Sequence, residues 1–512
     1  MHGVMRLARL RTKSRCSAFR SIALALLVLA CDAGSPARDA EPSNVPPSVV
    51  PNVPANVPPN IPPNVPPNIV LVIADDQGWR DYGFMGSRIA RTPNLDALAA
   101  SGTVFTHGFT TASACRPSLK SLLSGLEPQR IRALEQGLGE RNVPFPEIAA
   151  MIELDTLPRQ LRRAGYVSFQ GGKHWEGHFE QTGFDAGTAV GFDAERAKRH
   201  GAMHELSGGA GLELGRSTLS PLLDFVRAHR DQPFFVWFAP MLPHVPHDPP
   251  PEFRDPYAQA GLGAAAQAYF GNVSRLDARV GELLGELDAL GLRERTLFVF
   301  VADNGWQQDP TLDSDPGQLG GAQGKFSIGE LGFRTPMIFS WPGSLPAGRR
   351  DDSLVSTLDL FPTLLDFAGV RTGGALEPPS GRTGVDLRGL LEGRPAAVRE
   401  HLIAGTRRLR ADYGRGSSAQ KQSDAGFAAV NDEEAFFLRA RDWRYVWLPG
   451  LGLEQLFAID DDPEERFDVA ARHPDLVARY RAAVDAWRRE MSVPAPVRAE
   501  GSNEPARNHR AP

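Results

Sequence analysis

Cys115 and the residues after it form the part of the sequence with the clearest chemical potential. The chain has three cysteines, and two of them, Cys16 and Cys31, lie in an N-terminal segment that has the features of an export signal. Cys115 is then left without a disulfide partner, so it is either an inert core thiol or a reactive group. Proline at position 117 and the leucines at 122 and 123 predict that Cys115 lies in the first turn of a helix. Unpaired backbone N–H groups and the positive end of the helix dipole favour an anion there.

Two apolar segments are each followed by a pair of oxygen-bearing side chains. Residues 68–74 and 295–302 are almost continuously apolar or β-branched, a pattern typical of buried strands in a parallel sheet. Each pair alone is also common in a helix cap or a turn, but polar residues after two parallel strands meet at one sheet edge. A set of ligands made only of oxygen atoms, with no sulfur or imidazole nitrogen among them, suits a hard cation such as Ca²⁺. The predicted metal ligands are Asp75, Asp76, Asp303 and Asn304.

Strand-like and helix-like segments alternate through most of the chain. A third apolar run, 234–239, leads to Pro243 and His244. This alternation predicts an α/β fold with a central, mostly parallel sheet flanked by helices. The helical patterns between the strands lie at 94–101, 154–164 and 273–290.

The sequence changes character beyond about residue 393. Residues 435–448 have the pattern of antiparallel strands, and 475–491 form an amphipathic helical pattern. We therefore expect a smaller C-terminal α+β subdomain at 394–495, followed by a disordered tail at 496–512.

The N-terminus predicts export. Residues 1–31 combine a basic region with an apolar stretch that is too short to span a bilayer. Residues 28–31 resemble a bacterial lipoprotein cleavage box, which would make Cys31 a lipid anchor in the periplasm or at the cell surface; ordinary cleavage without an anchor is the alternative. Twelve of the 36 residues from 32 to 67 are proline, so this segment is predicted to be an extended linker without a core.

The overall charge argues against one class of partner. The 512 residues carry a formal net charge of −5, and no basic stripe dominates the sequence. We therefore predict no nucleic-acid binding.

The segment 115–125 resembles the signature Cys-x-Pro-Ser-Arg-x-x-Leu-Leu-Thr-Gly of the formylglycine-dependent sulfatases. Ser124 replaces the threonine, and Leu119 occupies the arginine position. The resemblance implies an alkaline phosphatase-like fold with the catalytic domain at 68–393. Further similar segments lie at 73–79, 92–99, 165–166, 302–305, 358–365, 384–387 and 455–464.

The family resemblance implies a specific chemistry for Cys115. A formylglycine-generating maturation enzyme would oxidise it to formylglycine, which would share one Ca²⁺ with the four oxygen ligands and hydrolyse sulfate esters. Export and family together suggest sulfated glycans or other sulfated small molecules as substrates.

Basic residues in similar segments would complete the site. Lys325 matches the lysine of a Lys-x-x-x-x-Glu-x-Gly-x-Arg-x-Pro segment, and His244 matches the histidine of a His-x-Pro segment, with His247 close by. The family usually has Gly-Lys-Trp-His where this chain has Gly-Lys-His-Trp. Lys173 therefore carries over as a sulfate ligand. Trp175 occupies the histidine position, and either His174 or the nearby His178 is its candidate substitute.

Leu119 keeps two other interpretations open, because leucine supplies no charge where the family has arginine for site support and for selection by the maturation enzyme. One alternative is a phosphodiesterase or phosphonate hydrolase of the same superfamily, whose members often use two metals. The other is a non-catalytic, anion-binding lipoprotein with an unmodified Cys115.

Overall fold

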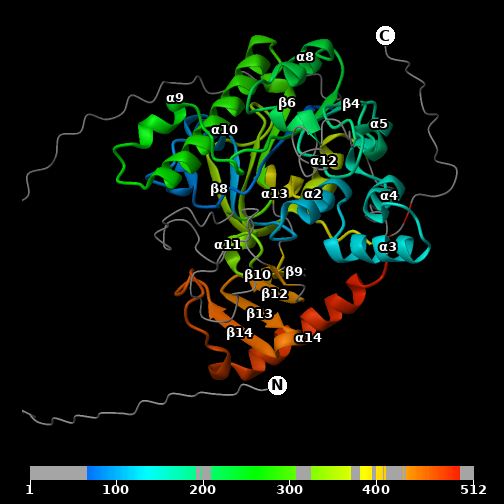
Figure 1. Ribbon diagram of the computed structural model, residues 1–512, viewed down its shortest axis with the longest axis vertical. Helices are drawn as coiled ribbons and strands as arrows, with labels where there is room; N and C mark the ends of the chain where they lie inside the picture. Colours follow the sequence, from blue (N-terminus) through cyan, green and yellow to red (C-terminus); the bar gives the residue numbers. More distant parts are fainter. Residues whose placement is uncertain are drawn as a thin grey trace, which may run out of the picture. The chain divides into compact units, whose positions relative to one another are not determined.

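An eight-stranded sheet organises the computed structural model of the chain (Figure 1). The strand order is β4-β3-β5-β1-β6-β7-β2-β8, and only β7 runs antiparallel to its neighbours, so the predicted mostly parallel sheet is confirmed. The strands are β1 (Asn68–Ala74), β2 (Thr103–Phe109), β3 (Val167–Gly172), β4 (Ala186–Gly187), β5 (Phe234–Ala239), β6 (Thr296–Ala302), β7 (Arg334–Ser340) and β8 (Arg349–Ser356).

The structure describes most of the chain beyond the N-terminal segment. The described residues are 66–191, 209–306, 324–370, 381–394, 399–406 and 434–495, with short stretches at 198, 409–410, 430–431 and 497. The predicted signal peptide at 1–31, its Cys31, all but the last two residues of the linker at 32–67 and nearly all of the tail at 496–512 lie outside them. None of the helices described has both the length and the apolar character that a bilayer crossing requires.

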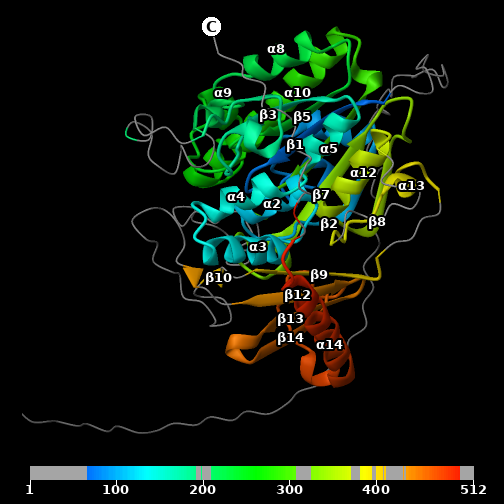
Figure 2. The same ribbon diagram turned by 90° about the vertical axis from the view of Figure 1, so that its right-hand side faces the viewer.

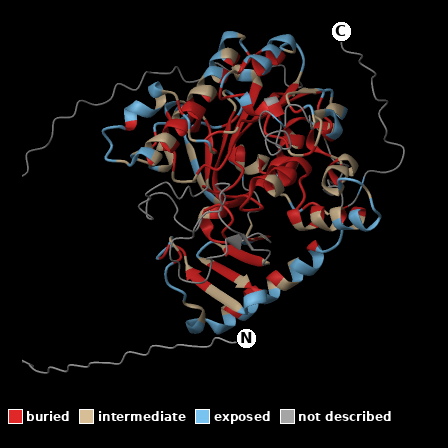
Figure 3. Ribbon diagram, viewed as in Figure 1, coloured by how far each residue is buried: buried red, intermediate tan, exposed pale blue. Residues whose placement is uncertain are grey.

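Helices cover both faces of the large sheet, which explains the continuous apolar run in β1. Successive side chains of a strand point to opposite faces, and all seven residues of β1 are buried. Ile69, Leu71 and Ile73 pack in a cluster with the helices between 115 and 163 and the helix Leu360–Phe367, whereas Val70 and Val72 pack in a second cluster with the helices Pro93–Ala100, Ser220–Ala228 and Ala264–Ala289. Figure 2 shows these helix layers from the side, and Figure 3 shows buried strands behind helices with exposed outer turns.

Four of the described α-helices overlap the segments predicted to be helical, although the helix Ala264–Ala289 begins well before the predicted start at 273. The predicted helices at 94–101, 154–164, 273–290 and 475–491 correspond to α1, α5, α10 and α14. The α-helices are α1 (Pro93–Ala100), α2 (Cys115–Ser124), α3 (Pro128–Glu140), α4 (Pro146–Glu153), α5 (Leu157–Arg163), α8 (Ser220–Ala228), α9 (Pro251–Arg254), α10 (Ala264–Ala289), α11 (Glu330–Phe333), α12 (Leu360–Phe367), α13 (Arg388–Leu391) and α14 (Pro474–Met491). Short 3₁₀ turns are η1 (Gly83–Met85), η2 (Phe179–Thr182), η3 (Gly209–Glu213), η4 (Asp255–Tyr257), η5 (Arg293–Arg295), η7 (Thr357–Asp359), η8 (Pro449–Leu451) and η9 (Ala470–Arg472).

A four-stranded antiparallel sheet follows the large sheet, as predicted for the C-terminal part. Its strand order is β14-β13-β12-β9, and α14 packs against β12 and β13. An apolar cluster joins Phe109 and Phe333 from the first sheet and α11 to Phe437 and Val446 from the second. The strands are β9 (His401–Thr406), β12 (Ala435–Ala440), β13 (Trp443–Leu448) and β14 (Leu453–Ala458), and a separate pair is β10 (Leu409–Arg410) with β11 (Val430–Asn431).

A buried charge network also connects the two sheets. Glu330, at the start of α11, accepts hydrogen bonds from Arg334 of β7 at 3.0 Å and from Arg439 of β12 at 2.8 Å. Arg444 of β13 forms an ion pair with Glu465 at 2.6 Å, and Glu465 in turn accepts the backbone N–H of Glu330 at 2.7 Å. Burial raises the pKa of Glu330, but Arg439, Arg334 and Arg444 together lower it to about 2.

The network generates a stability prediction. Glu330→Gln would leave buried arginines without their counter-charge, and removing one member of such a network typically costs about 3–5 kcal/mol. We expect urea unfolding to give a correspondingly lower free energy of unfolding. Because the folded-state pKa lies below the ordinary value of 4.5, the contribution of Glu330 is present above pH 4.5 and is lost as the pH falls toward 2.

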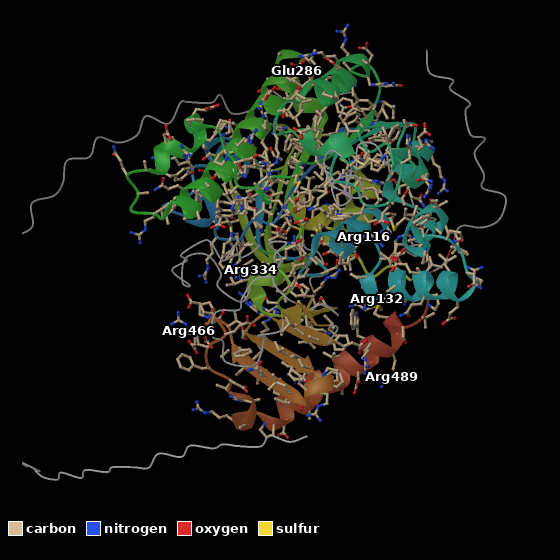
Figure 4. All side chains as sticks on the ribbon, in the orientation of Figure 1. Arg116, Arg132, Glu286, Arg334, Arg466 and Arg489 are labelled. Atoms are coloured by element: carbon tan, nitrogen blue, oxygen red, sulfur yellow. The ribbon has the colours of Figure 1, made fainter. Side chains whose placement is uncertain are left out.

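Glu286→Gln is the matched control, since Glu286, labelled in Figure 4, pairs with the exposed Arg227. Exposed ion pairs contribute little, so this variant should unfold almost like the parent. Equal effects of the two substitutions would show that the buried network does not stabilise the junction.

Candidate active site

The predicted oxygen ligands meet at the carboxyl ends of β1 and β6. These strands pair in parallel with Ala74 opposite Ala302, so the two polar pairs leave the sheet side by side. The backbone N–H of Asp76 donates to Asp303 at 3.1 Å, and the Asn304 amide donates to Asp76 at 2.7 Å. All four side chains are buried. Asp76 has a φ of 63°, a left-handed conformation that costs a non-glycine residue about 1–2 kcal/mol.

Cys115 faces this acidic cluster from the first turn of α2. The helix begins at Cys115, as the sequence pattern predicts, and Ala114 before it is extended. The sulfur lies in one group with carboxylate oxygens of Asp75 and Asp303, all within 4.8 Å of one another. Burial raises the pKa of the Cys115 thiol, against the opposing effect of Lys173 and Lys325. The unmodified side chain is therefore a thiol rather than a thiolate at neutral pH.

Two buried lysines neutralise part of the acidic cluster. The Nζ of Lys173 lies 2.8 and 2.7 Å from the two carboxylate oxygens of Asp75. The Nζ of Lys325 lies 2.7 Å from Oδ1 and 2.8 Å from Oδ2 of Asp76. Although burial opposes ionisation, Lys173, His244 and Lys325 lower the pKa of Asp75 to about 2.

Asp303, the third carboxylate of the cluster, has no lysine paired with it among the described residues, whereas Asp75 and Asp76 each have one. Burial first, and then the charge of Asp75, raise the pKa of Asp303 well above its ordinary value. Oδ2 of Asp303 and Oδ1 of Asn304 are buried and have no hydrogen-bond partner among the described residues. Buried acceptors without donors are rare and call for an explanation. This oxygen-rich set fits a hard divalent cation.

His244 completes the group on the side of β5. Its Nε2 lies 3.4 Å from Oδ2 of Asp76, and Asp75, Asp76 and His244 offer ligand atoms within 4.8 Å of one another. Burial, aided by the two lysines and opposed by the aspartates, lowers the pKa of His244 to about 4. Its Nδ1 lies 2.7 Å from the carbonyl of Val245, which can only accept, so Nδ1 carries a proton and Nε2 faces the cluster.

His174 has its contacts elsewhere. Its Nε2 is 2.9 Å from the hydroxyl of Thr182, and its ring packs edge-on against Phe184. Burial lowers the pKa of His174 to about 4. The Trp175 ring, by contrast, lies 5.5 Å from the Nζ of Lys173. The structure therefore brings the other predicted residues together and directs His174 into the neighbouring loop.

Leu119 packs in the apolar cluster beneath the large sheet. It is 5% exposed and shares this cluster with Leu122 and Leu123 of the same helix. The cations beside it on α2 pair with carboxylates outside the acidic cluster: Arg116, labelled in Figure 4, binds Glu176 at 3.0 Å, and Lys120 pairs with Glu135. The positive charges that act on Cys115 come from Lys173 and Lys325 instead.

The sequence analysis missed Glu176 and Arg216. Glu176 ties the segment after Lys173 to α2, and Arg216 binds the backbone around His244. Neither residue belongs to a motif, and the pattern around Arg216 is uninformative, so no local signal identifies them.

The chain is similar to several known proteins. The family profile described as Sulfatase matches residues 67–370, more than half of the chain. N-acetylgalactosamine-6-sulfatase of Canis lupus familiaris is 34% identical over 360 residues, covering 62% of this chain and 65% of that protein. The chain thus aligns with just under two thirds of this relative's length.

Solved structures show a shared fold. Ps i-CgsB is similar with a TM-score of 0.64 and 25% identity, covering 83% of this chain and 93% of that one. The phosphonate monoester hydrolase of Agrobacterium radiobacter has a TM-score of 0.56 and 20% identity, covering 83% and 96%. At 20% identity, the similarity to the phosphonate monoester hydrolase shows a shared fold and nothing more.

The acidic cluster predicts that Asp303→Asn affects the melting temperature differently in the absence and in the presence of a divalent cation. Without divalent ions, Asp303→Asn should raise the melting temperature or leave it unchanged, because it removes a desolvated carboxylate beside Asp75. Calcium should raise the melting temperature of the parent protein and have little effect on this variant. Thermal unfolding in EDTA and in excess Ca²⁺ measures both.

Asp288→Asn, at an exposed position near the end of α10, controls for the chemistry of the substitution and should retain the full calcium response. A calcium response in Asp303→Asn as large as that of the parent would exclude Asp303 as a ligand.

Proposed function

The chain belongs to the sulfatase family, since the family profile covers more than half of it, and we propose that it hydrolyses sulfate esters through a formylglycine derived from Cys115. One observation carries the proposal: the Cys115 sulfur lies in the same buried group as carboxylate oxygens of Asp75 and Asp303. A formylglycine-generating enzyme is the implied maturation partner. When formed, the hydrated aldehyde supplies the attacking oxygen and later releases sulfate by collapsing to the aldehyde.

Calcium is the proposed cofactor. The four oxygen ligands Asp75, Asp76, Asp303 and Asn304, with the oxidised residue 115, would hold one ion. Bound there, Ca²⁺ would promote ionisation of the attacking hydroxyl and neutralise sulfate charge. The unpartnered oxygens of Asp303 and Asn304 support this assignment.

The two lysines are placed to bind the sulfate group. Lys173 and Lys325 are buried and each contacts a different aspartate, Asp75 and Asp76. A cation shared by those aspartates would weaken their hold on the lysines, whose N–H groups could then point to sulfate oxygens. Preformed donors in a water-poor site stabilise developing charge more than donors in bulk water do.

His244 is the proposed proton carrier to the leaving alcohol. Because its pKa is lowered to about 4, its Nε2 is unprotonated at neutral pH. The ring would take up a proton at this atom, such as the one lost by the attacking hydroxyl, before passing it to the leaving oxygen. Its Nδ1–H is held by Val245, so any proton delivered to or taken from the cluster is exchanged at Nε2. Such transfers typically contribute roughly 10²–10⁴-fold to the rate. His174 has no part in the proposed mechanism, because its contacts are with Thr182 and Phe184.

Sulfated glycans are the proposed substrate class. The name of the relative that is 34% identical specifies a sulfated amino sugar. The predicted export signal and the lipid anchor at Cys31 would place the enzyme in the bacterial periplasm or at the cell surface, where polymeric sulfate esters are accessible.

Phosphonate or phosphodiester hydrolysis is the second candidate function. The phosphonate monoester hydrolase shares the fold, and lysines and a cation also suit phosphoryl oxygens. In the described residues, however, both possible metal-binding groups share Asp75 and form one cluster. One cluster favours sulfate esters over a two-metal mechanism.

The test of the proposed function begins with the peptide that contains residue 115. In protein from a host that has the maturation enzyme, mass analysis should detect the aldehyde. This protein should hydrolyse aryl sulfates faster than aryl phosphonates or phosphodiesters. Cys115→Ala should abolish that activity without lowering the melting temperature, because the nucleophile is lost while the core is retained.

An intact thiol in every molecule, with no sulfate ester hydrolysed, would instead favour anion binding by an unmodified chain. A preference for phosphonates would favour the second candidate.

A further inference from the structure

Arg216 lies in the turn after η3 and binds the segment that carries His244. Its Nε donates to the carbonyl of Met241 at 3.1 Å, and its Nη2 donates to the carbonyls of His244 and Pro246 at 2.7 and 3.1 Å. Its Nη1 contacts the carboxylate of Asp248. One guanidinium, only 8% exposed, therefore binds four acceptors spread over eight residues.

The segment 241–248 depends on contacts with other elements for its position. It contains no helix or strand, and Pro243 and Pro246 lack backbone donors. The segment contacts the large sheet through the hydrogen bond from the N–H of Asp75 to the carbonyl of Leu242 at 2.9 Å and through the buried Leu242 side chain, which packs in the same apolar cluster as Val72. Carbonyl groups beside a buried site need donors, and the planar fork of arginine supplies several at once in a fixed geometry.

Helix α10 in turn holds Arg216 in place. Arg275 donates to the carbonyl of Arg216 and lies 3.7 Å from Asp248. Asn272, fully buried in the same helix, donates to the carbonyl of Pro246 at 3.1 Å. Arg216 is thus connected to α10 through its backbone carbonyl and to the backbone of His244 through its side chain.

We propose that Arg216 is a positioning residue that holds the His244 ring against Asp76. It binds the His244 carbonyl directly, and the Nε2 of that ring lies 3.4 Å from Asp76. Loss of the connection would let the segment and the ring move while Lys173 and Lys325, which come from other segments, stay in place. The proposal rests on the proposed function, because the proton transfer assigned to His244 belongs to it.

A double-mutant cycle with an aryl sulfate tests the connection. Arg216→Gln should lower kcat by roughly 10²-fold, the loss that a displacement of about 1 Å can cause, and change KM by less than about threefold. In a His244→Ala background the same substitution should cost less than about threefold more, since residues that act through one another are not additive. Arg216→Lys should recover only part of kcat, because an ammonium cannot replace the planar fork.

Arg279→Gln is the matched control. Arg279 donates to the carbonyl of Gly215, next to Arg216, and to Glu282, and neither acceptor lies in 241–248. This variant should keep the parent kcat. If Arg216→Gln and His244→Ala multiply as independent losses, Arg216 does not act through His244 and the proposal is overturned.

A crystal structure of Arg216→Gln gives a readout that does not need activity. We expect the His244 ring to lie about 1 Å or more from its present position relative to Asp76. An unmoved ring would overturn the proposal even if the rate fell. If the parent protein hydrolyses no sulfate ester, the proposed function fails, whereas this structure still decides whether Arg216 positions His244. Should Arg216→Gln not fold, Arg275→Gln, which releases Arg216 from α10, provides the same comparison.

Discussion

Three carboxylates buried at one edge of the sheet are the constraint on which the rest of the site depends. Asp75 and Asp76 each form an ion pair with a lysine. Burial and the charge of Asp75 together raise the pKa of Asp303. Desolvating unpaired carboxylates is expensive. The fold accepts this cost at the point where β1 and β6 end side by side, and a divalent cation is the partner that would remove it.

The segments around this charge are held by backbone hydrogen bonds to one another. The N–H of Asp303 donates to Ala74, and the N–H of Phe326 donates to Ser113, close to the start of α2. Glu330, five residues after Lys325, is bound by arginines of the C-terminal sheet. The second sheet therefore acts on the site through the segment that carries Lys325, although it provides none of the predicted site residues.

Helix α2 contacts two different environments: Leu119 packs in the apolar core, and Cys115 faces the charged site. The Leu119 side chain adds to the core beneath the sheet, where an arginine would need a buried counter-charge. The positive charge near Cys115 comes from Lys173 and Lys325, on segments distant in sequence. The arrangement explains how the helix is stable with leucine at this position.

Local patterns in the sequence were sufficient to predict several strands and helices and the polar residues that follow the strands. Continuous apolar runs predicted β1, β5 and β6, because strands buried on both faces have no polar side, and proline after Cys115 predicted the start of α2. Motif resemblance identified Lys173, Lys325 and His244 as candidate site residues.

Local patterns carry no information about which lysine contacts which aspartate, 98 and 249 residues away, or that His174 turns toward Thr182. The role of Arg216 likewise depends on acceptors 25 to 32 residues further along the chain. Such contacts are decided by tertiary packing, because a side chain's partners are set by where its segment lies against others and not by the residues next to it.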